Sequence, residues 1–218
     1  MYAEEIIKGF MRVATASVAD AVDKVVGKRG YMDEAVKPRI NDKKIVGPAV
    51  TILEGPTGEF LPPSHALDAI DESPEGSVIV IGLFSGPDPN VALWGGLMAA
   101  GAEVNGLAGA VLDGGVRDVT EIRRDSGFQV FARSVSPGTT LGRYKTVAAN
   151  VPVMCGSVQV EPGDLIVGDL DGVVVVPRLH VEAVLKIALE IEERELEQAR
   201  LIRESRSLRE GLAKYGRI

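Results

Sequence analysis

The order of short apolar segments along the chain constrains its fold more than any other feature. Segments with strand character alternate with helical segments up to about residue 125, and strands then dominate to residue 176. This order favours a mixed sheet layered with helices, followed by a β-rich second half. We therefore expect an α/β protein of layered sheets flanked by helices.

The expected strands are short apolar runs bounded by turn-forming residues, at residues 45–53, 77–83, 107–112, 128–133, 151–160, 165–167 and 173–176. The expected helices show apolar residues at helical spacing, at residues 3–12, 15–26, 65–72, 93–104 and 119–125. Loops are predicted at residues 54–64 and 134–150, which contain Gly and Pro.

The C-terminal segment differs from the rest of the chain. Residues 180–210 contain neither Pro nor Gly and predict one long helix. Its first half has an apolar stripe, whereas residues 192–210 are charged nearly all round. Such a half-helix either extends into solvent or packs on another subunit. We divide the chain into an α/β domain of residues 1–179 and a C-terminal helix of residues 180–218, which we expect to pack on a neighbouring subunit.

Composition excludes several classes of protein. The net charge of −7 argues against a nucleic-acid surface, and no apolar run approaches the roughly 20 residues of a membrane span. Glu4 and Glu5 precede any apolar run, which is the wrong order for a signal peptide. The single cysteine, Cys155, allows no intrachain disulfide. We expect a soluble, cytoplasmic protein with no nucleic-acid or membrane partner.

Residues 107–118 are the most informative for function. The apolar run from Ala108 to Leu112 predicts a buried strand that ends in a turn at residues 113–115, and Arg117 and Asp118 follow. Arginine can hold an anionic oxygen pair in a bidentate fork, and aspartate offers a hard oxygen to a divalent metal ion. The pair suits a small carboxylic acid together with Mg²⁺ or Mn²⁺. A surface ion pair that caps a helix would explain the same two residues.

Four segments together resemble the RraA-like family, which includes the 4-hydroxy-4-methyl-2-oxoglutarate aldolases that also decarboxylate oxaloacetate. The matching segments are TASVADAVD at residues 15–23, WGGLM at 94–98, GAVLDGGVRD at 109–118, and PGD at 162–164 with Asp169 and DGVVVVP at 171–177. The resemblance covers nearly the whole chain. It implies a swivelling β/β/α-type fold and homotrimers or homohexamers in which neighbouring subunits share each active site.

The resemblance also implies roles for individual residues. Arg117 would bind the substrate carboxylate or oxo group, and Asp118 would hold the divalent metal ion. Backbone amides at the start of a helix would bind the carboxylate, and these map onto Gly95, Gly96, Leu97 and Met98. The start of a glycine-rich helix is a favourable site for an anion.

The match to the aldolases is poorer at two positions, and one further feature favours catalysis. Gly96 stands where the aldolases carry an acidic residue that helps to order a metal-bound water. The aldolases use a glutamate from a neighbour's C-terminal helix, for which Glu193 is the candidate, although a solvated helix face would also explain it. The ribonuclease-inhibiting branch tends to lack the metal aspartate, whereas this chain retains Asp118.

These residues favour a divalent-metal-dependent lyase that cleaves a small 2-oxo acid through a pyruvate enolate. The reaction would be a class II-type retro-aldol cleavage, a decarboxylation of oxaloacetate, or both. Two alternatives remain open, a regulatory protein-binding module without catalysis and a lyase of the same family with a different acid substrate. Two further residues are ambiguous, since Asp113 could reach the site or shape the predicted turn, and Trp94 could line the pocket or pack in the core.

Overall fold

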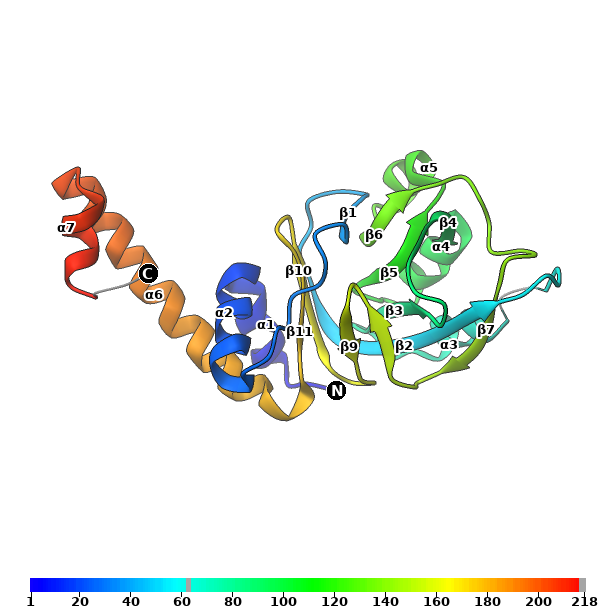
Figure 1. The fold of residues 1–218 in the computed structure, drawn as a ribbon, viewed down its shortest axis with the longest axis horizontal. Helices are drawn as coiled ribbons and strands as arrows, with labels where there is room; N and C mark the ends of the chain where they lie inside the picture. Colours follow the sequence, from blue (N-terminus) through cyan, green and yellow to red (C-terminus); the bar gives the residue numbers. More distant parts are fainter. Residues whose placement is uncertain (62–63, 216–218) are drawn as a thin grey trace.

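The computed structural model describes residues 1–61 and 64–215 and confirms the α/β class. Within the described residues, nine strands form one nearly closed, barrel-like sheet in the order β1-β6-β5-β3-β2-β10-β11, with β4 against β5 and β7 against β2 (Figure 1). The sheet strands are β1 (Lys37–Pro38), β2 (Ile45–Pro56), β3 (Val78–Leu83), β4 (Asp88–Trp94), β5 (Gly109–Val116), β6 (Val130–Val135), β7 (Tyr144–Ala149), β10 (Leu165–Asp169) and β11 (Gly172–Val176). Strands β2, β3, β5 and β6 run parallel, and β10 and β11 add an antiparallel extension.

Helices cover the sheet on two sides, as expected for layered sheets flanked by helices. They are α1 (Glu4–Arg12), α2 (Thr15–Val26), α3 (Ser64–Glu72), α4 (Gly96–Val104), α5 (Val119–Asp125), a short 3-10 turn η1 (Arg178–His180), α6 (Val181–Ser205) and α7 (Leu208–Ala213). Helices α3, α4 and α5 pack on the parallel strands through one apolar cluster. Helices α1, α2 and the first half of α6 pack on β10 and β11 through another.

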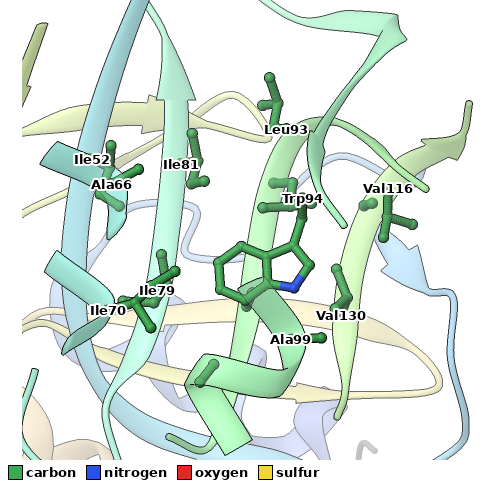
Figure 2. Close-up of a cluster of buried hydrophobic side chains, with 14 of the residues drawn as sticks. Ile52, Ala66, Ile70, Ile79, Ile81, Leu93, Trp94, Ala99, Val116 and Val130 are labelled. Atoms are coloured by element: carbon green, nitrogen blue, oxygen red, sulfur yellow. The ribbon is translucent and has the colours of Figure 1, made fainter. Parts of the chain in front are cut away.

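The cluster beneath α3 and α4 is built from side chains of alternating strand positions. Ile52, Ile79 and Ile81 project from β2 and β3 toward Ala66 and Ile70 of α3 (Figure 2). On β4, which pairs with β5, Trp94 lies under α4, and its ring stacks on Phe128 with centroids 5.8 Å apart. A third cluster fills the space between the sheet and a separate hairpin of β8 (Val153–Cys155) and β9 (Val158–Val160). None of the described helices is long and apolar enough to cross a membrane.

The predicted turn at residues 113–115 is wrong, because β5 continues through both glycines to Val116. The glycines serve close packing instead. A Cβ at Gly114 would lie 2.8 Å from Leu93 Cγ of β4, and one at Gly115 would lie 2.9 Å from Ser134 Oγ of β6. Two neighbouring strands therefore approach β5 at this point more closely than side chains would permit.

Other expectations also need correction. Strands β4 and β7 occupy regions where no strand was predicted, and the expected helix at residues 93–104 begins at Gly96 because Trp94 ends β4. The expected strand at residues 151–160 folds into the β8–β9 hairpin, since Gly156 and Ser157 both adopt positive φ. The expected loop at residues 54–64 begins late, because β2 extends to Pro56.

The C-terminal helix is also not continuous. Helix α6 ends at Ser205, Arg206 adopts a left-handed conformation, and Ser207 caps α7 by accepting a hydrogen bond from the Glu210 amide at 3.2 Å. Serine followed three residues later by glutamate is a helix-start signal, which explains the break without Pro or Gly. Helix α7 then folds back, so that Gly211 packs on Ile202 of α6. Figure 1 shows this pair of helices projecting away from the sheet.

Candidate active site

Arg117 and Asp118 lie directly after β5, where the strand meets the end of β4. The Arg117 amide donates to the carbonyl of Trp94 at 2.9 Å, which fixes the end of β5 beside the start of α4. Asp118 has a φ of 59° and is the N-cap of α5. Aspartate is among the few non-glycine residues that tolerate this left-handed conformation. The backbone therefore turns both side chains toward the N-terminus of α4.

The carboxylate of Asp118 touches both the helix start and the neighbouring arginine. Its Oδ2 accepts a hydrogen bond from the Gly96 amide at 2.9 Å and lies 3.5 Å from Arg117 Nε. The side chains of Arg117 and Asp118 are 43% and 40% exposed. An exposed pair at this distance is weak, so either group can turn to a ligand at little cost.

The two glycines at the start of α4 are not equivalent. A Cβ on Gly95 would lie 2.8 Å from Asp118 Oδ2 and 3.1 Å from Arg117 Nε, so any side chain there would displace both groups. A Cβ on Gly96 would have its nearest neighbour, Asp118 Cβ, at 3.5 Å, which is ordinary contact. The close approach of the strand end to the helix thus requires glycine at position 95 and tolerates a small side chain at position 96.

A cavity of about 320 Å³ opens beside this corner. It is lined by the residues Glu54, Leu67, Ala92, Leu93, Trp94, Gly95, Gly96, Leu97, Met98, Arg117, Asp118, Thr139, Thr140 and Leu141. Five predicted substrate-binding residues, Gly95, Gly96, Leu97, Met98 and Arg117, are therefore brought together with Asp118. Trp94 serves both of its predicted roles, because it is 1% exposed in the core and also borders the cavity.

The first turn of α4 lines the cavity with Gly96, Leu97 and Met98. The first amides of a helix have no intrahelical acceptor, and they carry the positive end of the helix dipole. Gly96 already donates to Asp118. The amides of Leu97 and Met98 follow in the same first turn, where a substrate carboxylate could accept from them.

Glu54 is a second carboxylic acid on the cavity wall, and its environment differs from that of Asp118. It is 1% exposed, and burial raises its pKa from 4.5 to about 7. The sequence prediction missed this residue. The sequence does contain a signal for it. Val50, Ile52 and Glu54 are spaced two residues apart on one strand, so Glu54 places a charged residue where the pattern expects an apolar one.

Asp118 offers an exposed carboxylate, which is the kind of hard oxygen ligand that Mg²⁺ prefers, whereas zinc sites are built mainly from His and Cys. Across residues 1–61 and 64–215, no group of three or more His, Cys, Asp or Glu side chains is placed to hold a metal ion. Mg²⁺ is commonly held by one or two carboxylates, with water and substrate oxygens completing its coordination. The exposed carboxylate of Asp118, beside the first turn of α4, agrees with that donor set.

Two other sequence candidates lie elsewhere in this chain. Glu193 is exposed on α6 and does not line the cavity, while the adjacent Glu192 accepts hydrogen bonds from the Ala14 amide at 2.6 Å and from Ser17 Oγ at 2.9 Å. Asp113 faces the β8–β9 hairpin, where it accepts from Gly156 N at 2.9 Å. Neither of the two roles considered for Asp113 applies, because it stabilises the hairpin instead.

A larger cavity of about 680 Å³ lies between α2, β11 and residues 29–37. Several of its charged groups are engaged within the protein. Arg29 and Arg133 both bind Asp33, at 3.1 Å and 2.8 Å, and Lys37 donates to the Asp171 carbonyl at 2.5 Å. The smaller cavity is the better candidate because its arginine and aspartate are held only loosely.

Relatives named as aldolases share much of this sequence. A protein of Halalkalibacterium halodurans named "Putative 4-hydroxy-4-methyl-2-oxoglutarate aldolase" is 35% identical over 187 residues, which cover 84% of this chain and 82% of that protein. A protein of the same name from Burkholderia multivorans is 32% identical, covering 76% of this chain and 96% of the relative.

Two solved structures show the same fold over most of their length. An uncharacterized protein from Pseudomonas syringae has a TM-score of 0.84 at 28% identity, covering 96% of this chain and 97% of that one. Streptomyces coelicolor RraAS2, described as an unusual member of the RNase ES inhibitor RraA protein family, has a TM-score of 0.77 at 26% identity, with coverage of 89% and 95%. The RraA-like family model, described as Aldolase/RraA, matches residues 15–175. The chain therefore belongs to the RraA-like family.

Proposed function

We propose that this protein is a divalent-metal-dependent lyase that cleaves small 2-oxo acids to release pyruvate. Its substrates would be oxaloacetate, 4-hydroxy-4-methyl-2-oxoglutarate, or both. The observation that carries the proposal is the loosely held Arg117–Asp118 pair, which meets the N-terminus of α4 in one cavity. The names of the aldolase relatives support the same reaction class.

Each group of the site has a task in such a reaction. The first-turn amides of α4 would bind the substrate carboxylate and orient the bond to be broken. Arg117 would stabilise the negative charge that develops on the keto oxygen as the carbon–carbon bond breaks. Asp118 would hold Mg²⁺ or Mn²⁺, which when bound supplies Lewis-acid polarisation of the keto group.

A mechanism through a lysine Schiff base has no support at this cavity. Among its lining residues that the structure describes, the only basic side chain is Arg117. The charge on the developing enolate must then be stabilised without a covalent bond to the protein. This requirement favours the metal-dependent, class II-type reaction.

The proposal includes a homotrimer or homohexamer with active sites shared between subunits. The distal part of α6 projects from the sheet, and it carries the exposed apolar residue Leu196. Glu193 lies on the same projecting helix and would enter a neighbouring subunit's site. Light scattering on the full chain should give a trimer or hexamer, and a monomer would contradict this part of the proposal.

The reaction is tested by measuring pyruvate release from both acids with Mg²⁺ or Mn²⁺, after subtraction of the metal's own slow decarboxylation. Release should stop on addition of a chelator. It should be lost in Asp118→Asn, which keeps a residue suited to the left-handed backbone. Asp125→Asn is the matched control, because Asp125 lies at the far end of α5 and pairs with Arg124.

Two outcomes would contradict the proposed function. Equal release by the wild type and Asp118→Asn would remove Asp118 from the chemistry. Absence of pyruvate from both acids would reject these substrates. Cleavage of another small acid would then favour a family lyase of different specificity, and stoichiometric capture of a protein partner without metal binding would favour a regulatory module.

A further inference from the structure

Glu54 occupies a position that the strand pattern assigns to a core side chain. In the parallel register of β2 and β3, Val50 pairs with Ile79, Ile52 with Ile81, and Glu54 with Leu83. All of the apolar members of these pairs belong to the cluster beneath α3 and α4. Glu54 therefore places a carboxyl group at the end of an inward-facing apolar row.

The carboxyl group is buried without a full set of partners. Glu54 is 1% exposed, and its Oε2 has no hydrogen-bond partner within the described residues. Thr146, its cross-strand neighbour on β7, likewise has a buried Oγ1 without a partner. Burying an acid this way is unfavourable unless a ligand or a function compensates, and the cost is smaller for the protonated form. Burial accordingly raises the pKa of Glu54 to about 7.

The group borders the same cavity as the Arg117–Asp118 pair. The phenol of Tyr144, which lies near Glu54, is already engaged. Tyr144 of β7 donates to Asp88 Oδ2 of β4 at 3.0 Å, and burial, chiefly, raises the pKa of Tyr144. Arginine side chains do not release protons in proteins, so Arg117 cannot act as an acid. Of these groups, Glu54 is placed to bring a transferable proton into the cavity.

We propose that Glu54 is the acid that protonates the carbon of the enolate formed in this cavity. The inference rests on the proposed lyase function. In oxaloacetate, the C3–C4 bond breaks, its electron pair becomes the C2–C3 π bond, the C2=O π pair moves onto the keto oxygen to give the enolate, and C4 leaves as carbon dioxide. The C2–C3 π electrons then form a C3–H bond with the Glu54 proton while the enolate oxygen restores the C2=O bond, giving pyruvate. The Glu54 carboxylate regains a proton from water.

Solvent exchange of the pyruvate methyl protons isolates this step, because it reverses and repeats the protonation without breaking a carbon–carbon bond. Proton NMR would follow pyruvate in D₂O with Mg²⁺. Wild-type protein should catalyse exchange, and Glu54→Gln should slow it by about 10²-fold or more, as for loss of a general acid. Glu54→Asp should restore part of the rate. Glu59→Gln, at an exposed glutamate nearby in sequence, should exchange like the wild type.

The outcomes separate this inference from the proposed function. If Glu54→Gln exchanged the pyruvate methyl protons as fast as the wild type, the role of Glu54 would be overturned and the proposed lyase function would stand. The role of Glu54 would be supported if Glu54→Gln lost pyruvate exchange but consumed oxaloacetate at a rate reduced much less, since decarboxylation itself needs no acid. If the wild type neither exchanges pyruvate nor cleaves either acid, the proposed function fails, and the role of Glu54 fails with it.

A second measurement needs neither metal nor turnover. Infrared difference spectra across the pH range should show a protonated-carboxyl carbonyl band that titrates near the raised pKa of about 7. The band should be absent from Glu54→Gln and present in Glu59→Gln. An unchanged band in Glu54→Gln would show that Glu54 is not the buried acid, and the inference would be withdrawn.

Discussion

Two arginine–aspartate pairs differ in how fully the protein satisfies them, one joining β5 to β6 and the other directly following β5. Arg133 Nε lies 2.7 Å from Asp113 Oδ1, and these side chains are 11% and 4% exposed. The Arg117–Asp118 pair after β5 is 3.5 Å apart and about 40% exposed on both sides. The first pair is buried and close, whereas the second is open and loose.

The surroundings of each pair extend the contrast. Asp113 also accepts from the Gly156 amide at 2.9 Å, and Arg133 also binds Asp33 at 2.8 Å. These contacts tie β5 and β6 to the β8–β9 hairpin and to Asp33. The open pair holds one amide of α4 and leaves the guanidinium fork accessible. A fully paired network indicates a structural role, and a partly paired one beside a cavity indicates binding.

The largest expected effect is loss of stability on breaking the buried pair. Arg133→Ala leaves Asp113 as an uncompensated buried charge, which costs about 3–5 kcal/mol of unfolding free energy. Urea denaturation measures this change. Arg124→Ala is the matched control, since the Arg124–Asp125 pair is exposed, and its midpoint should not move. A stable Arg133→Ala would show that the two pairs do not differ as described.

Breaking the open pair should give the opposite pattern. Arg117→Ala should lower pyruvate release by about 10²–10³-fold, the range for loss of a group that stabilises developing charge. Its unfolding free energy should stay within about 1 kcal/mol of the wild type. Parallel kinetics and urea denaturation check both statements. Normal activity combined with reduced stability would reverse the assignment of the two pairs.

The buried acid predicts a pH-dependent stability. In the unfolded chain Glu54 releases its proton near 4.5, and in the folded protein near 7. Between these values the folded state binds more protons, so stability falls as pH rises and levels off above about 7. The total loss is about 3 kcal/mol. Glu54→Gln should remove this pH-dependent loss, so the variant should become more stable relative to the wild type as pH rises. Urea midpoints at low and neutral pH give the comparison, and equal pH slopes would contradict the burial argument.

The smallest effect concerns the two glycines at the start of α4. Gly95 has an extended backbone that alanine can adopt, but the added Cβ would displace Asp118 and Arg117. Gly95→Ala should therefore reduce kcat/KM by about tenfold to a hundredfold, as for a small misplacement of catalytic groups. Gly96→Ala should act like the wild type because its Cβ has room. Equal losses in both variants would argue against close packing as the cause.

The sequence allowed prediction of those features of the two pairs that depend on residues close together in the chain. Arg117 and Asp118 are adjacent to each other and follow a strongly apolar strand, so their place at a strand end could be inferred. The start of α4 was also close to correct. The role of Asp113 was missed because it depends on Arg133 and Gly156, which only the folded sheet brings near.

Other features escaped prediction because their signals are weak or distant in sequence. Strand β7 is a half-exposed partner of β2 whose register no local pattern specifies. Glu54 and Arg117 line the same cavity although they are far apart in sequence, because the parallel sheet brings β2 and the end of β5 to the same side. The break at Arg206 did have a local signal in Ser207 and Glu210, which outweighed the absence of Pro and Gly.

The claim that the open pair is a metal-dependent site is tested most directly by measuring metal binding in the presence and absence of an enolate analogue. Oxalate is a planar dianion shaped like the pyruvate enolate, and Mn²⁺ binding can be followed by electron paramagnetic resonance. The wild type should bind Mn²⁺ more tightly when oxalate is present. Asp118→Asn should lose the metal, and Arg117→Ala should retain it without the gain from oxalate. Equal Mn²⁺ binding by the wild type and Asp118→Asn would contradict the assignment of the open pair as the metal-dependent site.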